Sequence, residues 1–198
     1  FLNQPKIIKW NLARFAECII PFMDDNNDKA IEIATQTINT FEEIYKKKWL
    51  NMMRDKLGLF GEDTNDQALI IDLLNWMNDN KADYTNTFCF LMGQKFSINK
   101  KYNNEDFLIW KKKWDSRLKL NNNTQEKYLK LMHSVNPLVI PRNHKVEEAL
   151  DSANNNDLSP LNELTKVLAN PYQSQKGITN YQSAPPIADQ KYQTFCGT

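Results

Sequence analysis

The sequence has few glycines and almost no excess of charge of either sign, and each shortage excludes a class of function. None of its five glycines belongs to a GxGxxG or GxxxxGK[ST] pattern, so we expect no loop that cradles phosphates within this chain. Lys and Arg together number 25 against 24 Asp and Glu, which gives a formal net charge of +1. That balance predicts neither a nucleic-acid partner nor binding to an anionic membrane.

Long apolar runs and paired cysteines are also missing. The longest wholly apolar run is about six residues, around Ile19 to Met23, far short of the roughly 20 needed to span a bilayer. The three cysteines, Cys18, Cys89 and Cys196, contain no CxxC pair. We therefore expect neither a disulfide framework nor a zinc site, and a reducing compartment is the default.

What the sequence does contain is helical periodicity. Hydrophobic residues make up 41% of the chain, enough for a core, and they recur at spacings of three and four. The pattern predicts an all-α fold, with a helical portion over residues 1–171 and an extended tail over residues 172–198. The aromatic residues of the tail indicate that part of it lies on the surface of the helical portion.

The first predicted helix, Asn3 to Met23, is the most apolar. It carries Ile8, Leu12, Phe15 and Ile19 on one face, and further apolar residues widen that face over most of the circumference. Such a helix belongs inside a domain. Since so little of the chain precedes it, we expect its packing partners to be encoded upstream.

Two polar residues of this helix, Asn11 and Arg14, are candidate site residues. If the helix is interior, both are partly buried and must find partners, because an unpaired buried polar group costs roughly 1 to 3 kcal/mol. Their partners lie either in a missing upstream segment or within this chain.

Further helices are predicted along the chain by apolar spacing, capping residues and prolines. Trp110 and Trp114 are four residues apart, which fits a core stripe better than a platform for stacking bases. His133 and His144 have no metal-ligand spacing, so we assign no metal to them. The predicted helices run from Asp28 to about Leu57, Thr64 to Asn78, Asp83 to Met92, about Asn104 to Leu118, Thr124 to Val135, Asn143 to Asn154, and Ser159 to just before Asn170, with a buried connector at Leu138 to Pro141.

Several segments, taken in order, resemble the selenoprotein O family, also called YdiU. They are NQPKIIKWNLARFAE in the first helix, KLGL at 56–59, DYTNTF at 83–88, SVNPLVIPRNHKVEEAL at 134–150, NPY at 170–172 and the terminal FCGT. The resemblance covers essentially the whole chain. It concerns only the C-terminal part of that family.

The resemblance implies a protein-kinase-like fold, called a pseudokinase, that transfers AMP from ATP to Ser, Thr or Tyr hydroxyls of proteins with Mg²⁺ or Mn²⁺. In the family, the residues that bind nucleotide and metal lie upstream of the NQP motif. The resemblance therefore implies no catalytic, cofactor-binding or metal residue in this chain, which we expect to be inactive alone and to self-associate. Its implied partners are the missing N-terminal half and protein substrates, and its implied location is the cytoplasm, or the mitochondrion in a eukaryote.

Within the resemblance, the first helix is similar to the large central helix of a kinase C-lobe. Asn11 and Arg14 would then support the missing catalytic segment. Cys196 matches a terminal Cys or selenocysteine of the family, which implies a redox role through pairing with an upstream cysteine; the alternative is a plain tail residue. One departure is Cys89, because the family often has Arg at this position.

A different class of function is the alternative to the enzyme. The chain would then be a helical scaffold or protein-interaction module, whose wide apolar surface docks a partner without any catalytic role.

Overall fold

The computed structural model describes residues 3–94, 100–120 and 124–183. Within these ranges every regular element is a helix and there is no strand, which confirms the all-α class. Ten α-helices and two 3₁₀-helices occur there: α1 Gln4–Ile19, η1 Ile20–Phe22, α2 Asn27–Asn39, α3 Phe41–Lys56, α4 Asp66–Asp79, α5 Tyr84–Leu91, η2 Lys100–Asn103, α6 Glu105–Lys119, α7 Gln125–Val135, α8 Asn143–Asn154, α9 Ser159–Leu168 and α10 Thr179–Gln182.

The chain divides into two compact units, Phe1–Met53 and Arg54–Thr198. This division does not fall at the predicted boundary between residues 171 and 172. No helix in the described part of the chain is both long and apolar enough to cross a membrane.

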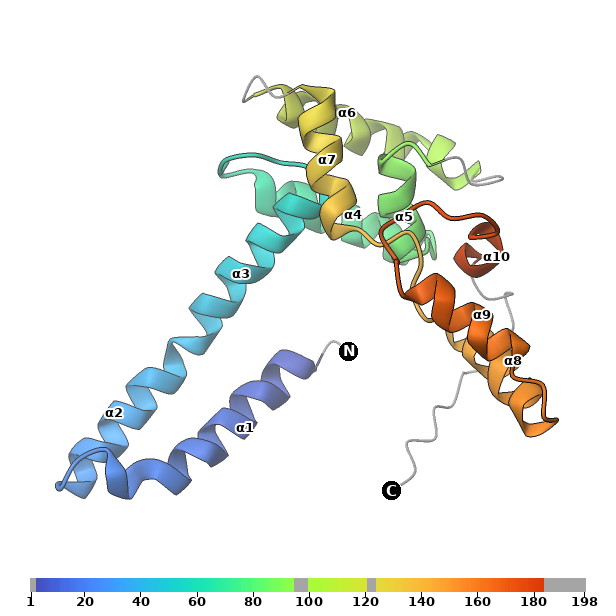
Figure 1. The fold of residues 1–198 in the computed structure, drawn as a ribbon. Helices are drawn as coiled ribbons and strands as arrows, with labels where there is room; N and C mark the ends of the chain where they lie inside the picture. Colours follow the sequence, from blue (N-terminus) through green and yellow to red (C-terminus); the bar gives the residue numbers. More distant parts are fainter. Residues whose placement is uncertain (1–2, 95–99, 121–123, 184–198) are drawn as a thin grey trace. The chain divides into compact units, whose positions relative to one another are not determined.

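The first unit is a helical hairpin. Helices α1 and α2 lie side by side, joined through η1 (Figure 1). Their buried residues are small: Ala16 in α1, and Ala30 and Ala34 in α2. Alanines let two helices approach closely but bury little apolar area. Pro5 lies in the first turn of α1, where a missing N–H costs no helical bond, whereas the side chain of Asn3 forms no capping hydrogen bond.

The single helix predicted from Asp28 to about Leu57 is wrong, because the helix is interrupted at Thr40. Its backbone N–H bonds the carbonyl of Thr37 at 3.2 Å, and its hydroxyl donates to the same carbonyl at 2.7 Å. Threonine hydroxyls compete with the backbone for helical carbonyls, so a threonine can end a helix that apolar spacing alone would continue. The cap also lies earlier than predicted, since the side chain of Asn26 accepts from the N–H of Lys29.

Three capping residues in the second unit confirm the predicted helix starts. Asp83 accepts from the N–H of Asn86 at 2.8 Å, and Asn104 accepts from the N–H of Phe107 at 2.8 Å. Thr124 caps α7 in the same way. Each side chain satisfies one of the backbone donors that a helix leaves free at its N-terminus.

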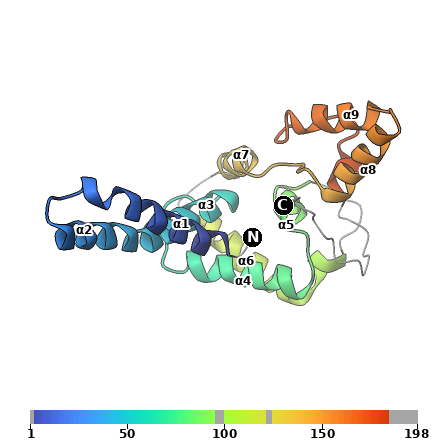
Figure 2. The same cartoon turned by 90° about the horizontal axis from the view of Figure 1, so that it is seen from below.

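The core of the second unit centres on α4 and α6, which pack against each other (Figure 2). Both predicted tryptophans of α6 are buried and stacked, with ring centroids 6.0 Å apart. The indole N–H of Trp110 donates to the carbonyl of Leu69 at 2.8 Å, and that of Trp114 donates to Leu57 at 2.9 Å. The prediction of a core stripe is confirmed.

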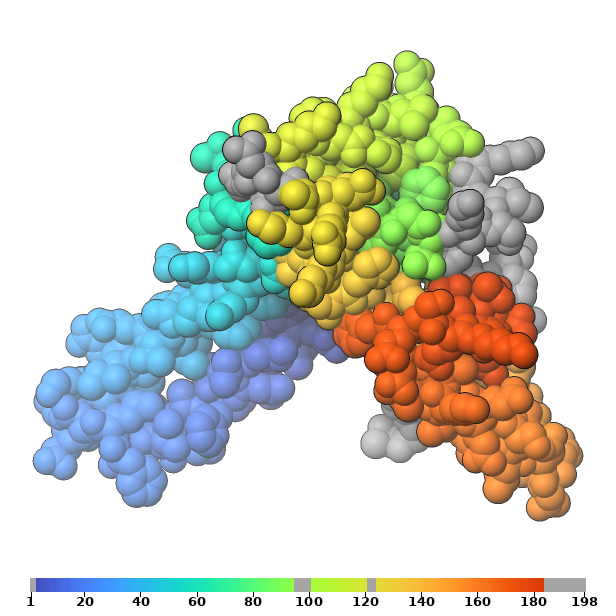
Figure 3. Space-filling model, turned by 45° about the horizontal axis from the view of Figure 1, so that its top comes forward, coloured from blue at the N-terminus to red at the C-terminus, as the bar shows by residue number. Residues whose placement is uncertain are grey.

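Helices α8 and α9 pack side by side and form a continuous orange lobe in the space-filling view (Figure 3). The segment that leads to α8 has no regular structure, and its Leu138 and Val139 are buried, which confirms the predicted connector. The predicted tail is extended only in part, because Thr179–Gln182 form a helical turn, α10. Ile178 and Gln182 are buried, so this part of the tail does adhere to the helices.

Candidate functional site

The apolar face of α1 is exposed. The exposed fractions are 56% for Ile7, 59% for Trp10 and 62% for Phe15, and Ala16 is the one buried residue that α1 contains. The sequence predicts an interior helix whose packing partners are encoded upstream, and within its own unit α1 is not enclosed. A helix with this much exposed apolar surface offers an interaction face.

Asn11 and Arg14 are exposed on the same helix. The guanidinium of Arg14 pairs with Glu17 at 2.6 Å and lies over the ring of Trp10, 5.6 Å from its centroid. The side chain of Asn11 makes no hydrogen bond with the part of the chain that the structure describes. The expected burial of these two residues depends on a segment upstream of this chain, so their burial and their support of a catalytic segment both stay predictions.

The cysteines differ in environment. Cys89 is buried, its thiol donates to the carbonyl of Pro137 at 3.5 Å, and burial raises the pKa of the thiol to about 12. Because the thiolate is the reactive form, the buried thiol of Cys89 is inert at physiological pH and serves as a core residue. Cys18 is exposed, and Cys196 lies outside the described residues.

Four of the segments that carry the family resemblance meet in the second unit: KLGL, DYTNTF, SVNPLVIPRNHKVEEAL and NPY. The first of their junctions is a reciprocal cap. The ammonium of Lys56 donates to the carbonyl of Val135 at 3.3 Å, at the end of α7, and to the side-chain oxygen of Asn136 at 3.2 Å. The amide of Asn136 donates in return to the carbonyl of Lys56 at 2.9 Å, at the end of α3. Each residue thus satisfies a carbonyl that the other helix leaves free.

The same lysine lies over two aromatic rings, 5.6 Å from the centroid of Tyr84 and 5.1 Å from that of Phe88. Burial lowers the pKa of Lys56 below its usual value. The contact to the two rings stabilises a cation that has lost part of its hydration.

A second junction joins the DYT and PRN segments. Arg142 makes a two-pronged ion pair with Asp83, at 2.7 and 2.9 Å, and donates to the side-chain oxygen of Asn86 at 3.2 Å. Burial opposes ionisation of Asp83, but the hydrogen bonds from Arg142 and the backbone outweigh it, and its pKa lies below the usual range. A third contact joins NPY, since the carbonyl of Pro171 accepts from the N–H of Leu138 at 2.7 Å. These motif residues fasten helices together.

The sequence analysis missed a buried ionic cluster around Asp66. This carboxylate is fully buried and accepts from Arg54 at 2.7 Å, from Arg117 at 2.7 and 3.2 Å, and from the N–H of Asp63 at 3.0 Å. Burial opposes its ionisation, yet the hydrogen bonds from Arg117 and Arg54 hold its pKa below the usual value. The sequence offered one sign of this cluster, an acidic residue in the first turn of a predicted helix. Such a residue indicates a helix start but does not identify the arginines that pair with it.

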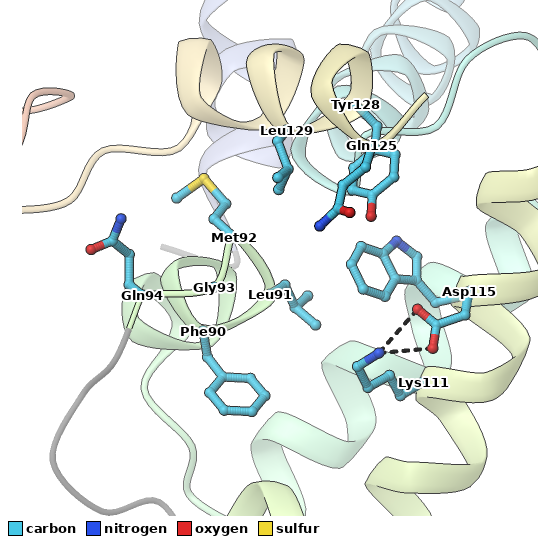
Figure 4. A pocket seen from close by; sticks show the side chains of 11 residues that line it. Phe90, Leu91, Met92, Gly93, Gln94, Lys111, Asp115, Gln125, Tyr128 and Leu129 are labelled. Atoms are coloured by element: carbon cyan, nitrogen blue, oxygen red, sulfur yellow. Dashed lines mark hydrogen bonds and ion pairs between the residues drawn. The ribbon is translucent and has the colours of Figure 1, made fainter. Parts of the chain in front are cut away.

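One pocket, of about 610 Å³, lies between the end of α5, α6 and the first turn of α7 (Figure 4). Leu129 and Gln125 point into it from α7, and Leu91 points into it from α5. Lys111 and Asp115 pair with each other at 2.7 Å at one side. Phe90, Leu91, Met92, Gly93, Gln94, Lys111, Trp114, Asp115, Gln125, Tyr128 and Leu129 line it. The lining fits an apolar group and offers no arrangement of nucleophile and base.

Among the described residues there is neither a cluster of metal-ligating side chains nor a glycine-rich phosphate loop. No three side chains of the metal-binding types lie close enough together to hold an ion within residues 3–94, 100–120 and 124–183. The positive-φ glycines there, Gly58, Gly61, Gly93 and Gly177, are single residues in separate turns, without the pattern of a phosphate-binding loop.

Comparison with known proteins gives a consistent result. The family model described as "Protein adenylyltransferase SelO" matches residues 1–169. A protein named "Protein nucleotidyltransferase YdiU" from Pelagibacter ubique (strain HTCC1062) is 57% identical over 196 residues, which are 99% of this chain and 41% of the relative. Proteins of the same name from Nitrosococcus oceani and Clostridium perfringens (strain 13 / Type A) are each 44% identical, over 100% and 99% of this chain and 40% of each relative.

The chain spans about two fifths of the length of these relatives. The family match covers more than four fifths of the chain, and it includes the KLGL, DYT and PRN segments of the junctions described above but ends just before NPY. The chain belongs to the protein adenylyltransferase SelO family.

Proposed function

We propose that this chain is the helical C-terminal part of a protein that transfers AMP from ATP to Ser, Thr or Tyr hydroxyls of other proteins. The name of the family and the names of the relatives, which say adenylyltransferase and nucleotidyltransferase, support the reaction class. The chain supplies support for that reaction and no reactive group. Nucleotidyl transfer needs metals and positioned charges around the phosphates. In this proposal those groups, with ATP and Mg²⁺ or Mn²⁺, belong to the part of the protein that precedes the chain.

The observation that carries the supporting role is the exposed apolar face of α1, with Ile7, Trp10 and Phe15. In the proposal, α1 is the central helix of a kinase-like C-lobe, and the remaining three fifths of the protein covers this face. Arg14 and Asn11 lie on the same helix and hold the catalytic segment by hydrogen bonds. The complete protein works in the cytoplasm, or in the mitochondrion of a eukaryote.

Nucleotide binding tests whether the ATP site belongs to the part of the protein that precedes this chain. Thermal unfolding of this chain and of the complete protein is measured with and without ATP and Mg²⁺. The complete protein should unfold at a higher temperature with nucleotide, because a ligand that binds the folded state stabilises it. This chain should not respond. A nucleotide-dependent shift in this chain alone would overturn the proposal.

Arg14 is tested in the complete protein by Arg14→Leu, with Lys6→Leu as the matched control. Lys6 is exposed on the same helix and forms no hydrogen bond or ion pair with the residues that the structure describes, so both variants remove one positive charge and add one leucine. AMP transfer to a protein substrate should fall in Arg14→Leu and stay unchanged in Lys6→Leu, at equal melting temperature. Unchanged turnover and stability in Arg14→Leu would contradict the role.

The exposed face also favours the alternative, a helical docking module without catalysis. Sedimentation or light scattering of this chain should show self-association, because exposed apolar patches tend to associate and so remove their surface from water. If the complete protein does not self-associate and does transfer AMP, the enzyme is supported. A complete protein that neither binds ATP nor transfers AMP supports the module.

A redox role of Cys196 belongs to the same proposal. Its thiol would form a disulfide with a cysteine of the missing part and restrain transfer. Cys196→Ser should then make activity insensitive to an oxidant such as diamide, whereas Cys18→Ser, which removes an exposed thiol in this chain, should not.

A further inference from the structure

The last described segment of the chain, residues 171–183, closes on a single residue of the connector. Pro171 accepts from the backbone N–H of Leu138 at 2.7 Å, and the side-chain amide of Gln182 donates to the carbonyl of the same Leu138 at 3.1 Å. The two ends of the segment are therefore held at one point. We call residues 171–183 the strap.

The far end of the strap is also bonded to α5. The side-chain amide of Asn86 donates to the backbone carbonyl of Gln182 at 3.0 Å. The orientation of this amide follows from its other partner. Arg142 can only donate, so the oxygen of Asn86 faces Arg142 and the nitrogen faces Gln182. Asn86, Arg142 and Gln182 are all more than nine-tenths buried, with exposed fractions of 9%, 7% and 5%.

The rest of the strap is weakly attached. Of residues 172–183, Ile178 and Gln182 are the ones that are buried. The side-chain amide of Gln175 donates to the carbonyls of Val167 and Asn170 at the end of α9, and the hydroxyl of Tyr181 donates to Glu163 of α9 at 3.3 Å in an exposed contact. A segment with few buried apolar groups opens locally before the core does. Figure 1 shows α10, which belongs to the strap, apart from the packed pair α4 and α6.

We infer that the strap is a detachable conformational device, fastened by the buried hydrogen bonds among Asn86, Leu138 and Gln182, and that it opens without unfolding the helices. These bonds are the latch. Residues 184–198 follow the strap directly, so the latch fixes the point from which the end of the chain departs. Opening of the strap involves no nucleotide. The test of this inference is therefore independent of the test of adenylyl transfer.

Two substitutions open the latch from opposite sides. Gln182→Ala removes the donor to Leu138. Asn86→Asp removes the donor to Gln182 but keeps an oxygen for Arg142, so the contact that orients α5 and the PRN segment is retained. Asn180→Ala is the control, because Asn180 lies in the same helical turn, is exposed, and has no side-chain bond among the residues described.

Amide hydrogen exchange, followed by mass spectrometry in the complete protein, tests the inference. Peptides that cover residues 172–183 should exchange about tenfold faster in Gln182→Ala and Asn86→Asp, the factor that the loss of one buried hydrogen bond produces. Exchange in α4 and α6 should stay within about twofold of the original protein. Asn180→Ala should behave like the original protein throughout.

Two results would overturn the inference. Unchanged exchange of the strap in both latch variants would mean that other contacts hold it. Faster exchange in α4 and α6 to the same extent as in the strap would mean that these bonds stabilise the whole unit and that the strap does not open by itself.

Discussion

The buried carboxylate of Asp66 gives the sharpest test of how the second unit is held together. It is fully buried between two guanidinium groups, at 2.7 Å from Arg54 and 2.7 Å from Arg117. Asp66→Asn keeps the shape of the side chain but removes its charge, so that two buried cations face a neutral amide. Removal of one partner from a buried ion pair costs about 3–5 kcal/mol of unfolding free energy. For a chain of this size, each kcal/mol lowers the melting temperature by roughly 2–4 °C.

The matched control is Asp72→Asn, in the same helix. Asp72 pairs with Lys113 at 3.3 Å, but both side chains are at least half exposed, so its loss should cost no more than about 1 kcal/mol. Urea unfolding, followed by circular dichroism at pH 7, measures both variants. If Asp66→Asn loses less than about 1 kcal/mol, like the control, then the cluster does not carry the stability that we assign to it.

Acid adds a second check on the same residue. The folded-state pKa of Asp66 is lowered, so its stabilising contribution is complete above the unfolded pKa of about 3.9 and is lost as pH falls through the folded value. The difference in stability between the original protein and Asp66→Asn should therefore be constant from neutral pH down to about pH 5, and shrink below about 3.9. A difference that already shrinks between pH 7 and 5 would mean that another group is responsible.

Three further substitutions test the helix junctions by melting temperature and urea midpoint. Gly58→Ala should cost at least about 1 kcal/mol, because Gly58 has φ +69° and an added Cβ would lie 3.0 Å from the Cβ of Tyr128; an unchanged midpoint would contradict this. Lys56→Met keeps the packing but removes the ammonium from the end of α7, and should cost about 1 kcal/mol; equal or higher stability would mean that the cap contributes nothing. Arg142→Lys cannot form the two-pronged pair with Asp83 and should lower the free energy of unfolding by about 1–3 kcal/mol. Unchanged stability would show that a single positive charge at this position is enough to hold the junction.

The sequence predicted those features that depend on neighbours in the chain. Asp83, Asn104 and Thr124 were recognisable as caps, because a capping side chain bonds a backbone N–H within three residues. The core role of Trp110 and Trp114 followed from their spacing. The class of the fold followed from the same periodicity.

The features that the sequence did not predict depend on competition or on distant partners. The break at Thr40 arises because a hydroxyl takes a carbonyl that the helix would use, and apolar spacing contains no sign of this. The cluster at Asp66 joins residues 12 and 51 positions away, and a charged residue in a sequence does not identify its partner. For α1, the spacing identified an apolar helix, but spacing alone does not show what covers its apolar face.

The reciprocal cap between Lys56 and Asn136 has a consequence for how this family can vary. A substitution at either position alone is unfavourable. Loss of the Lys56 ammonium leaves the carbonyl of Val135 at the end of α7 without this donor, and loss of the Asn136 amide does the same to the carbonyl of Lys56 at the end of α3. Tolerated replacements should therefore come in matched pairs. A double-mutant cycle across the two positions should show a coupling energy, and related sequences should change both residues together or neither.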